Sequence, residues 1–451
     1  MAYFGTNGVR GRFDELPPGL VLKLAQATGL YLAKSTPEGG RKAGRARIIV
    51  ARDCRLTGET YRAAVAAGLS EAGCDVIDIG MASSPTAEYM VKKLGTAGCI
   101  MITASHNPPE YNGIKAVDGN GIAISRKRGL EIEKLMDRPA NDKGSISGYP
   151  TATQEHIAAI VSLIDAKKIR KRKPKLVIDC GNGTAAFIAP QLLEGLGCEV
   201  LALNSHADGR FPGRPSEPTE ANVKELIETV KRSGSDAGIA WDGDGDRVVF
   251  VDEKGNYVIG DRVFALSILW KAAGRKLKGD IVTTVATSKA VEDVARKCGA
   301  KVRYTAIGAP ALCEDMARGG AAMGGEEVGG VIWPKLSMAK DGFMTAAKLA
   351  EALCDKPLGA WLRDVPSYCN VKLKMEADEK KKKGFVARVL AYAEKNKLAH
   401  IDVDGVRVNL DNGWVIVRAS GTEPYVRVFA EAKTEGEAQK LAREYVEIAK
   451  G

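Results

Sequence analysis

The sequence has no closely paired cysteines and few histidines, and both shortages exclude common kinds of site. None of its nine cysteines forms a Cys-x-x-Cys pair, and the set is odd in number and scattered over 451 residues. Such a set predicts neither a disulfide framework nor a structural zinc site. The four histidines are too dispersed for an obvious metal cluster. Neither disulfide nor zinc chemistry is therefore expected to organise this chain.

Long apolar runs are also missing. No stretch of about 20 apolar residues occurs, so no membrane-spanning helix and no membrane partner are predicted. The N-terminal residues MAYFGTNGVRGR place glycine and arginine where a signal peptide needs an apolar core, and we expect a cytoplasmic protein. Apolar residues make up 45% of the chain and charged residues 27%, a balance that excludes a disordered protein.

Acidic residues are outnumbered, with 56 against 66 lysines and arginines, which gives a net charge of +10. This charge fits an anionic partner, either nucleic acid or a phosphorylated small molecule. The densest basic runs, 167–175 and 380–383, contain none of the interleaved aromatic residues that a groove for single-stranded nucleic acid uses. We interpret both runs as solvated surface and expect no nucleic-acid partner.

Three stretches repeat one order of elements: a strand-like run, a polar turn, an amphipathic helical run and a second strand-like run. They cover residues 47–80, 175–204 and 280–308. Strand, helix and strand at this spacing predict βαβ units with parallel strands. A repeat of this length indicates three similar α/β domains in tandem, with mixed sheets, and is too long for a solenoid.

The end of the chain has another pattern. Helical runs at 380–397 and 435–450 enclose strand-like runs at 400–410, 414–418 and 425–431, which predicts a small α+β domain with antiparallel strands. We expect an α/β protein with an active-site cleft between four domains. Their predicted bounds are 1–150, 151–254, 255–366 and 367–451.

A serine loop follows the strand-like run 99–102. Its sequence, Thr-Ala-Ser-His-Asn-Pro-Pro at 103–109, stops any helix and makes a rigid loop. Ser105 and His106 are expected to be exposed at the end of a strand, where α/β sheets place their ligands. A serine nucleophile would need a base or a pre-loaded phosphate. A turn with incidental hydroxyls is the alternative.

Three aspartates alternate with glycines between two apolar runs. The carboxylates of Asp242, Asp244 and Asp246 can converge on a small hard cation, and Mg²⁺ suits them. Without a cation they would repel one another. An EF-hand is excluded, because Arg247 stands where that loop requires glycine and the flanks predict strands. A polar hairpin loop is the alternative.

Two later loops pair glycine with charge. The loop 324–330, Gly-Gly-Glu-Glu-Val-Gly-Gly, suits sugar hydroxyls or an amine, because its carboxylates repel phosphate. The loop 418–424, Arg-Ala-Ser-Gly-Thr-Glu-Pro, can form a nest of backbone N–H groups, and Arg418 and Arg427 beside it suit a dianionic phosphate. An ordinary turn is the alternative for each.

Each predicted domain contains one of these four loops. With the loops in this order, the sequence resembles the α-D-phosphohexomutase superfamily over its whole length. The segments Phe-Gly-Thr-Asn-Gly-Val-Arg-Gly at 4–11, Arg-Asp-x-Arg at 52–55 and Phe-Pro-Gly-Arg at 211–214 add to the resemblance. Within the superfamily, the sequence is most similar to the archaeal phosphoglucosamine, phosphomannose and phosphoglucose mutases. These share the Gly-Thr-x-Gly-Val-Arg-Gly start and the Gly-Gly-Glu-Glu-x-Gly-Gly loop.

The resemblance implies a mutase that interconverts hexose 6-phosphate and hexose 1-phosphate through a phosphoserine and a 1,6-bisphosphate, which also acts as the activator. Ser105 is implied to carry the phosphoryl group and, with the three aspartates, to hold Mg²⁺. The groups implied around the reacting phosphate are Arg10, Lys115, His106 and Arg247. Those implied at the sugar are Glu326 and Val328, and those at the other phosphate are Arg418, Ser420, Gly421, Thr422 and Arg427.

Some expectations rest on individual residues. Lys115 is a candidate proton shuttle, since burial and nearby cations can lower a lysine pKa, and a charge partner for phosphate is its alternative role. Val328 and Gly330 replace a serine and a histidine that many members have, and Lys340 stands where close relatives often have arginine. Glu327 is a candidate partner for a 2-ammonium group.

The sequence is compatible with several activities. We expect phosphoglucosamine mutase activity first, with phosphomannomutase or phosphoglucomutase activity as the alternative. A non-catalytic phosphosugar-binding protein and a phosphatase acting through the phosphoserine are further alternatives. The expected partner is a hexose phosphate, and the expected assembly is a monomer or a homodimer.

Overall fold

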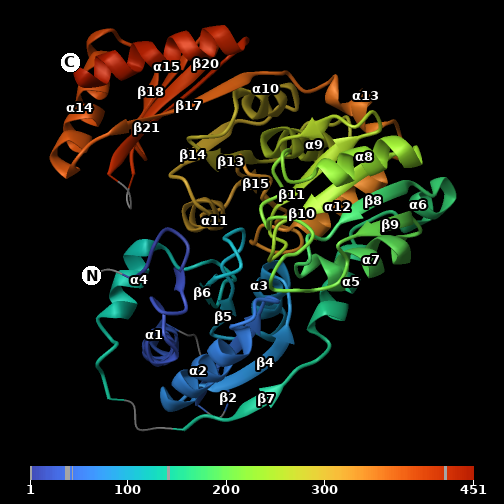
Figure 1. Ribbon diagram of the computed structural model, residues 1–451, viewed down its shortest axis with the longest axis vertical. Helices are drawn as coiled ribbons and strands as arrows, with labels where there is room; N and C mark the ends of the chain where they lie inside the picture. Colours follow the sequence, from blue (N-terminus) through green and yellow to red (C-terminus); the bar gives the residue numbers. More distant parts are fainter. Residues whose placement is uncertain (1–2, 36–40, 43, 140–142, 421–423) are drawn as a thin grey trace.

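The computed structural model describes residues 3–35, 41–42, 44–139, 143–420 and 424–451. Within these residues the chain builds four sheets with their helices, and the four units follow one another around an arc in chain order (Figure 1). No helix of the described residues is long and apolar enough to cross a membrane. All nine cysteines are free, as expected.

The first unit holds a mixed sheet in the order β1-β6-β5-β3-β4-β7, with β2 paired to β3. Strands β3, β4, β5 and β7 are parallel, β6 runs against them, and β1, antiparallel to β6, runs in their direction again. Its strands are β1 (Val9–Arg12), β2 (Arg41–Lys42), β3 (Arg45–Arg52), β4 (Asp75–Met81), β5 (Gly98–Ile102), β6 (Tyr111–Asp118) and β7 (Ile146–Gly148). Its helices are α1 (Pro18–Ser35), α2 (Gly58–Glu71), α3 (Ser84–Leu94) and α4 (Arg126–Glu133).

The second unit has the strand order β12-β11-β10-β8-β9. Parallel strands β9, β8 and β10 are followed by antiparallel β11 and β12, so the sheet ends in a hairpin. Its strands are β8 (Lys175–Asp179), β9 (Glu199–Leu203), β10 (Ala237–Trp241), β11 (Val248–Asp252) and β12 (Tyr257–Val258). Its helices are α5 (Ala152–Val161), α6 (Ala166–Arg172), α7 (Ala185–Leu196) and α8 (Lys224–Ser233).

The third unit has the order β14-β13-β15-β16. Its strands are β13 (Asp280–Thr284), β14 (Val302–Thr305), β15 (Ala321–Gly325) and β16 (Val331–Ile332), and its helices are α9 (Gly260–Ala272), α10 (Lys289–Lys297), α11 (Ala309–Ala317), α12 (Gly342–Ala352) and α13 (Leu358–Leu362). The predicted repeats are confirmed as β3-α2-β4, β8-α7-β9 and β13-α10-β14, each with parallel strands.

The fourth unit is an antiparallel sheet in the order β17-β21-β20-β19-β18, as its pattern predicted. Its elements are β17 (Cys369–Glu376), α14 (Glu379–Lys395), β18 (His400–Ile401), β19 (Val406–Leu410), β20 (Gly413–Ala419), β21 (Tyr425–Ala432) and α15 (Glu435–Lys450). Two details differ from the prediction. The run 400–410 is broken into two strands at Gly405, whose φ is +76°, and β17 was not predicted.

The second and third units share one hydrophobic core, whereas the first and fourth units have cores of their own. The shared core joins side chains of the second sheet to α9 and α12; Trp241 stacks on Phe343, for example, with ring centroids 5.8 Å apart. Helix α12 also packs against α5, α6 and α7. The loops between these units are therefore fixed to a common frame.

Candidate active site

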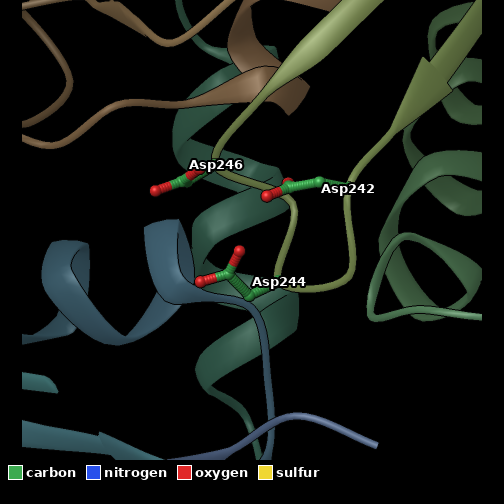
Figure 2. Close-up of side chains that lie close together, drawn as sticks. All are labelled: Asp242, Asp244 and Asp246. Carbon is green, nitrogen blue, oxygen red and sulfur yellow. The ribbon is translucent and has the colours of Figure 1, made fainter. Parts of the chain in front are cut away.

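The serine loop and the aspartate loop meet although they are far apart in the sequence. The serine loop joins β5 to β6, and the aspartate loop, residues 242–247, joins β10 to β11. Ser105 Oγ donates a hydrogen bond to Asp242 Oδ2 at 2.7 Å. One oxygen from each of Asp242, Asp244 and Asp246 lies within 4.8 Å of the others, and Figure 2 shows the carboxylates turned to the same side of the loop.

Ser105 lies at the end of a strand, as predicted, but the prediction that it is exposed was wrong. Its exposed fraction is only 3%, because the aspartate loop lies against it. Its backbone is unusual as well, with φ at +50°, a conformation that costs a residue with a Cβ about 1–3 kcal/mol. The surrounding structure has to supply this energy.

Arg55 holds the serine loop in that conformation. Its guanidinium is buried, forms an ion pair with Asp53, and donates to four backbone carbonyls of the loop and the residue after it, those of Ser105, Asn107, Pro108 and Tyr111. The Ser105 N–H donates to Thr103 Oγ1, and Thr103 Oγ1 donates to Asp53. The sequence segment at 52–55 therefore braces the loop, a role that its pattern alone did not indicate.

The aspartate loop fits a divalent cation. Asp244 Oδ1 and Asp246 Oδ1 are buried and have no hydrogen-bond partner among the described residues. Burial and the neighbouring charges of Asp244 and Asp246 raise the pKa of Asp242 well above its ordinary value. Three crowded carboxylates and a serine oxygen form the all-oxygen set that Mg²⁺ prefers, and a bound cation would relieve their repulsion.

Two buried lysines surround Asp246. Lys340 Nζ lies 3.1 Å from Asp246 Oδ2 and 2.5 Å from Glu326 Oε1, so it joins the aspartate loop to the glycine-rich acidic loop. Lys115 Nζ lies 4.0 Å from Asp246 Oδ2. Burial alone would raise the pKa of Asp246, but Lys340, Lys115 and Arg247 outweigh it and hold that pKa below its ordinary value.

The expectation of a lowered lysine pKa at position 115 was wrong. Burial acts to lower the pKa of Lys115, as supposed, but the charges of Glu88, Asp246 and Asp244 outweigh burial and raise it. Glu88, on α3, forms an ion pair with Lys115 at 2.5 Å. Lys115 is therefore a charged ammonium here, which favours its alternative role as a charge partner.

His106 accepts a hydrogen bond rather than acting as a charged group. Arg247 Nη1 donates to His106 Nδ1 at 2.9 Å, while Ser105 Oγ is 3.5 Å from the same nitrogen. Burial, with Arg247 and Arg10 nearby, lowers the pKa of His106 to about 3. The ring is neutral at neutral pH, and its Nδ1 lone pair is taken by Arg247. Arg10 itself donates to Asn107 of the serine loop at 2.8 Å.

The acidic loop, between β15 and β16, borders a cavity of about 300 Å³. Arg247, Glu327 and Val328 line it, together with Asp261 at the start of α9. Thr284 Oγ1 donates to Glu327 Oε2 at 3.0 Å, and burial followed by the charge of Glu326 raises the pKa of Glu327. Burial also raises the pKa of Asp261. The cavity therefore has two carboxyl groups whose pKa burial raises, and Lys372, which also lines it, offsets that rise only in part.

The basic loop joins β20 to β21, where Arg418 and Arg427 are directly paired across the two strands. Arg418 Nε donates to Asp404 Oδ1 at 2.6 Å, and Asp404 in turn accepts from the backbone of Ile307 in the third unit. Gly421 and Thr422, also predicted at this loop, lie outside the described residues.

One residue that contacts this loop was missed by sequence reasoning. Lys382 belongs to the basic run 380–383 that we interpreted as solvated surface, yet it is 3% exposed. Its Nζ donates to the carbonyl of Ser420 at 3.0 Å. The solvated interpretation is therefore wrong for Lys382, which brings a further cation to the loop. Helical position was the available signal, since Lys382 and Val389 both face the sheet from α14.

Comparison with family models matches four consecutive parts of the chain to phosphoglucomutase/phosphomannomutase. The alpha/beta/alpha domains I, II and III match residues 1–143, 154–255 and 259–368, and the C-terminal domain matches residues 370–448.

Relatives of known name extend over nearly the full length. A protein of Thermococcus kodakarensis named phosphoglucomutase/phosphomannomutase is 40% identical over 456 residues, which cover 99% of this chain and 97% of that protein. The phosphoglucosamine/phosphogalactosamine mutase of Sulfurisphaera tokodaii is 36% identical over 464 residues and 99% of each chain.

Solved structures are similar as well. A phosphoglucomutase/phosphomannomutase family protein of Burkholderia thailandensis has a TM-score of 0.86 and 27% identity, covering 100% of this chain and 98% of its own. An N-acetylphosphoglucosamine mutase of Aspergillus fumigatus was solved with GlcNAc-6P and magnesium. Its structure has a TM-score of 0.63 and 17% identity, and the match covers 99% of this chain and 95% of that one. At this low identity the likeness shows the fold alone.

Proposed function

This chain belongs to the phosphoglucomutase/phosphomannomutase family and is a phosphohexose mutase, and from that premise we propose that Ser105 carries the phosphoryl group and that a hexosamine phosphate is the preferred substrate. The observation that carries the first part is the contact between Ser105 Oγ and Asp242. It places a hydroxyl, held on a braced loop, against three converging carboxylates.

In the proposed reaction, the sugar hydroxyl attacks the phosphorus of phospho-Ser105. The bond from phosphorus to Ser105 Oγ breaks as the bond to the sugar oxygen forms, and the proton of the sugar hydroxyl ends on Ser105 Oγ, which gives a hexose 1,6-bisphosphate and a free serine. That intermediate turns round in the cleft and returns its other phosphate to the serine. Because the serine is held by Arg55 and the aspartate loop, the reacting atoms need little reorganisation, and such positioning is a main source of rate in phosphoryl transfer.

The metal site is proposed at the same place. Asp242, Asp244, Asp246 and the oxygen of Ser105 would hold Mg²⁺. When bound, Mg²⁺ supplies positive charge to the oxygens of the transferring phosphoryl group. Arg10, Arg247 and the ammonium of Lys115 add fixed positive charge to the same phosphate, while neutral His106 orients Arg247. A hexose 1,6-bisphosphate is proposed as the activator that first loads the serine.

The sugar end of the site favours an amino sugar. Glu326 is proposed to accept hydrogen bonds from the sugar hydroxyls, with Val328 beside it. Glu327 and Asp261 line the adjoining cavity, and burial raises the pKa of each carboxyl group. A 2-ammonium group would offset that penalty through charge-assisted hydrogen bonds, whereas a 2-hydroxyl would offset less. Glucose or mannose phosphate is the alternative, supported by the name of the Thermococcus relative.

A rate panel tests the substrate. The rates of glucosamine, glucose and mannose phosphates are measured in the presence of Mg²⁺ and a trace of hexose 1,6-bisphosphate, and we expect glucosamine phosphate to have the highest kcat/KM.

Glu327→Gln should lower the kcat/KM for glucosamine phosphate by about tenfold or more and change the value for glucose phosphate little, since a hydrogen bond to a charged group contributes about 1.5–3 kcal/mol. Exposed Glu131→Gln is the matched control. A higher kcat/KM for glucose or mannose phosphate would reject the hexosamine assignment and leave the mutase reading intact.

The basic loop is proposed to hold the phosphate that is not reacting, through Arg418, Arg427, Ser420 and the backbone of Gly421 and Thr422. Arg418→Ala should raise KM by about tenfold or more, because it removes a charge-assisted contact of about 1.5–3 kcal/mol. Steady-state kinetics check this result, with Arg443→Ala, an exposed arginine of the same unit, as the control. An unchanged KM would remove Arg418 from the phosphate site.

A further inference from the structure

A cavity of about 910 Å³ lies away from the residues of the candidate active site. It is bordered by α6, by the end of α9 and the segment after it, by residues 333–335 after β16, and by α12 and α13, elements found in the right-hand part of Figure 1. None of the predicted catalytic, metal, sugar or phosphate residues lines it. Its volume falls within the roughly 300–1,000 Å³ of typical small-molecule sites.

The cavity is strongly positive. Its lining holds two acidic residues, Glu351 and Asp355, and each already has a basic partner: Lys348 lies 2.7 Å from Glu351 and Lys168 lies 2.7 Å from Asp355. The other basic residues have no ion pair among the described part of the chain. They are Lys271, Arg275, Lys276, Lys278 and Lys335.

These cations are close enough to repel one another. Burial lowers the pKa of Lys271, and the charges of Lys335 and Lys348 lower it further. The three residues come from α9, from the segment after β16 and from α12, so the fold, and not one run of sequence, brings them together. Lysines that repel one another in a concave, partly buried site would be stabilised by an anion placed among them.

The remaining lining is apolar and aromatic. Three of the five tryptophans of the chain, Trp270, Trp333 and Trp361, border it, along with Leu277 and Met344. Trp333 is only 2% exposed, so the accessible aromatic surface comes from the half-buried Trp270 and Trp361. Trp270 Nε1 is buried and has no hydrogen-bond partner among the described residues. A lining with positive charge and aromatic surface fits a ligand with a multiply charged anionic part and a planar ring, because bases stack on aromatic side chains and phosphates bind lysine and arginine.

We propose that this cavity binds a nucleoside polyphosphate at a site separate from the catalytic one. The unpaired cations bind its phosphate chain, and the tryptophan-lined wall contacts its base. Inorganic polyphosphate shares the charge but lacks the ring, and should bind more weakly. A long nucleic-acid strand is disfavoured because the cationic surface is a bounded cavity and not an extended track.

The test measures ATP binding to the full chain without Mg²⁺, by calorimetry and by tryptophan fluorescence, to which the three tryptophans that border the cavity contribute along with the other two. ATP should bind at micromolar to low millimolar concentration, more tightly than tripolyphosphate, and should quench fluorescence. The double variant Lys271→Glu/Lys335→Glu should bind ATP at least about tenfold more weakly and keep its mutase activity, because neither lysine lies in the catalytic site. Lys127→Glu/Lys134→Glu, two exposed lysines of the first unit, is the matched control and should bind ATP as the unchanged protein does, apart from a general charge effect.

Three results would overturn the proposal. The first is no ATP binding at millimolar concentration and low salt. The second is ATP binding that glucose 1,6-bisphosphate displaces and the double variant retains, which would place the nucleotide in the catalytic cleft. The third is equal binding of tripolyphosphate, or tighter binding of a single-stranded RNA oligonucleotide through the same lysines. An unchanged circular dichroism spectrum of the double variant shows that it is correctly folded, so that a loss of ATP binding is not caused by misfolding.

Discussion

Ser105→Ala should abolish mutase turnover, with a loss on the order of 10⁴-fold or more, while the protein stays folded. The reason is that the serine oxygen forms and breaks a covalent bond in each half of the proposed reaction, and the methyl group of alanine cannot carry a phosphoryl group. Coupled-assay kinetics measure the loss, and mass spectrometry should show that the phosphoryl group added by hexose 1,6-bisphosphate is absent from the variant.

Two further variants make this result specific. Ser105→Gly also lacks the hydroxyl but tolerates the φ of +50°, so it should be equally inactive without any strain from a Cβ. Ser162→Ala, at an exposed serine, should keep full activity. Normal turnover in Ser105→Ala would reject the phosphoserine mechanism. Release of free phosphate that matches substrate loss in the unchanged protein would instead reveal a phosphatase.

Asp244→Asn should lower activity without lowering the thermal stability of the metal-free protein. Removing one carboxylate charge should weaken Mg²⁺ binding and lower kcat/KM by at least about 100-fold, the upper end of the loss seen when a group that merely orients a metal ligand is removed. The metal-free variant should melt at the same temperature as the metal-free parent or above it, because Asp244 is the charge that does most to raise the pKa of Asp242, after burial.

The measurement is a thermal melt with and without Mg²⁺. The unchanged protein should melt at a higher temperature when Mg²⁺ is added, since a ligand that binds only the folded state stabilises it, and the variant should lose most of this increase. Asp252→Asn is unsuitable as a control because that side chain holds a turn, so exposed Asp14→Asn is used. A variant that keeps the Mg²⁺ effect and full activity would reject the aspartate loop as the metal site.

The parts of the molecule that follow local patterns were predictable. The three βαβ repeats appear because alternating and helical periodicities act over a few residues, and the aspartate loop is found because its ligands lie within five positions of one another. Strand β17 was missed although Val371, Leu373 and Met375 alternate with polar residues. Its strand partner is β21, far along the chain, and half of its side chains remain exposed.

Other features depend on contacts that no spacing reveals. The pKa of Lys115 rises because α3 brings Glu88 beside it, against the effect of burial. Lys340 contacts both Asp246 and Glu326, because Asp341 caps α12 and binds His156 at 2.9 Å, which fixes the neighbouring backbone. Such contacts arise from packing between separate helices, strands and loops, and a single sequence carries no signal for them.

The core shared by the second and third units has a consequence for how the chain is made. Helix α12 completes the packing around α5, α6 and α7, yet it is synthesised long after the second sheet. The second sheet therefore leaves the ribosome with apolar side chains uncovered and must wait for residues near 350 before its core can close. The first unit has a complete core by about residue 152 and can fold while the rest is still being translated. The nascent chain thus has a long interval in which its middle, but not its beginning, needs protection from aggregation.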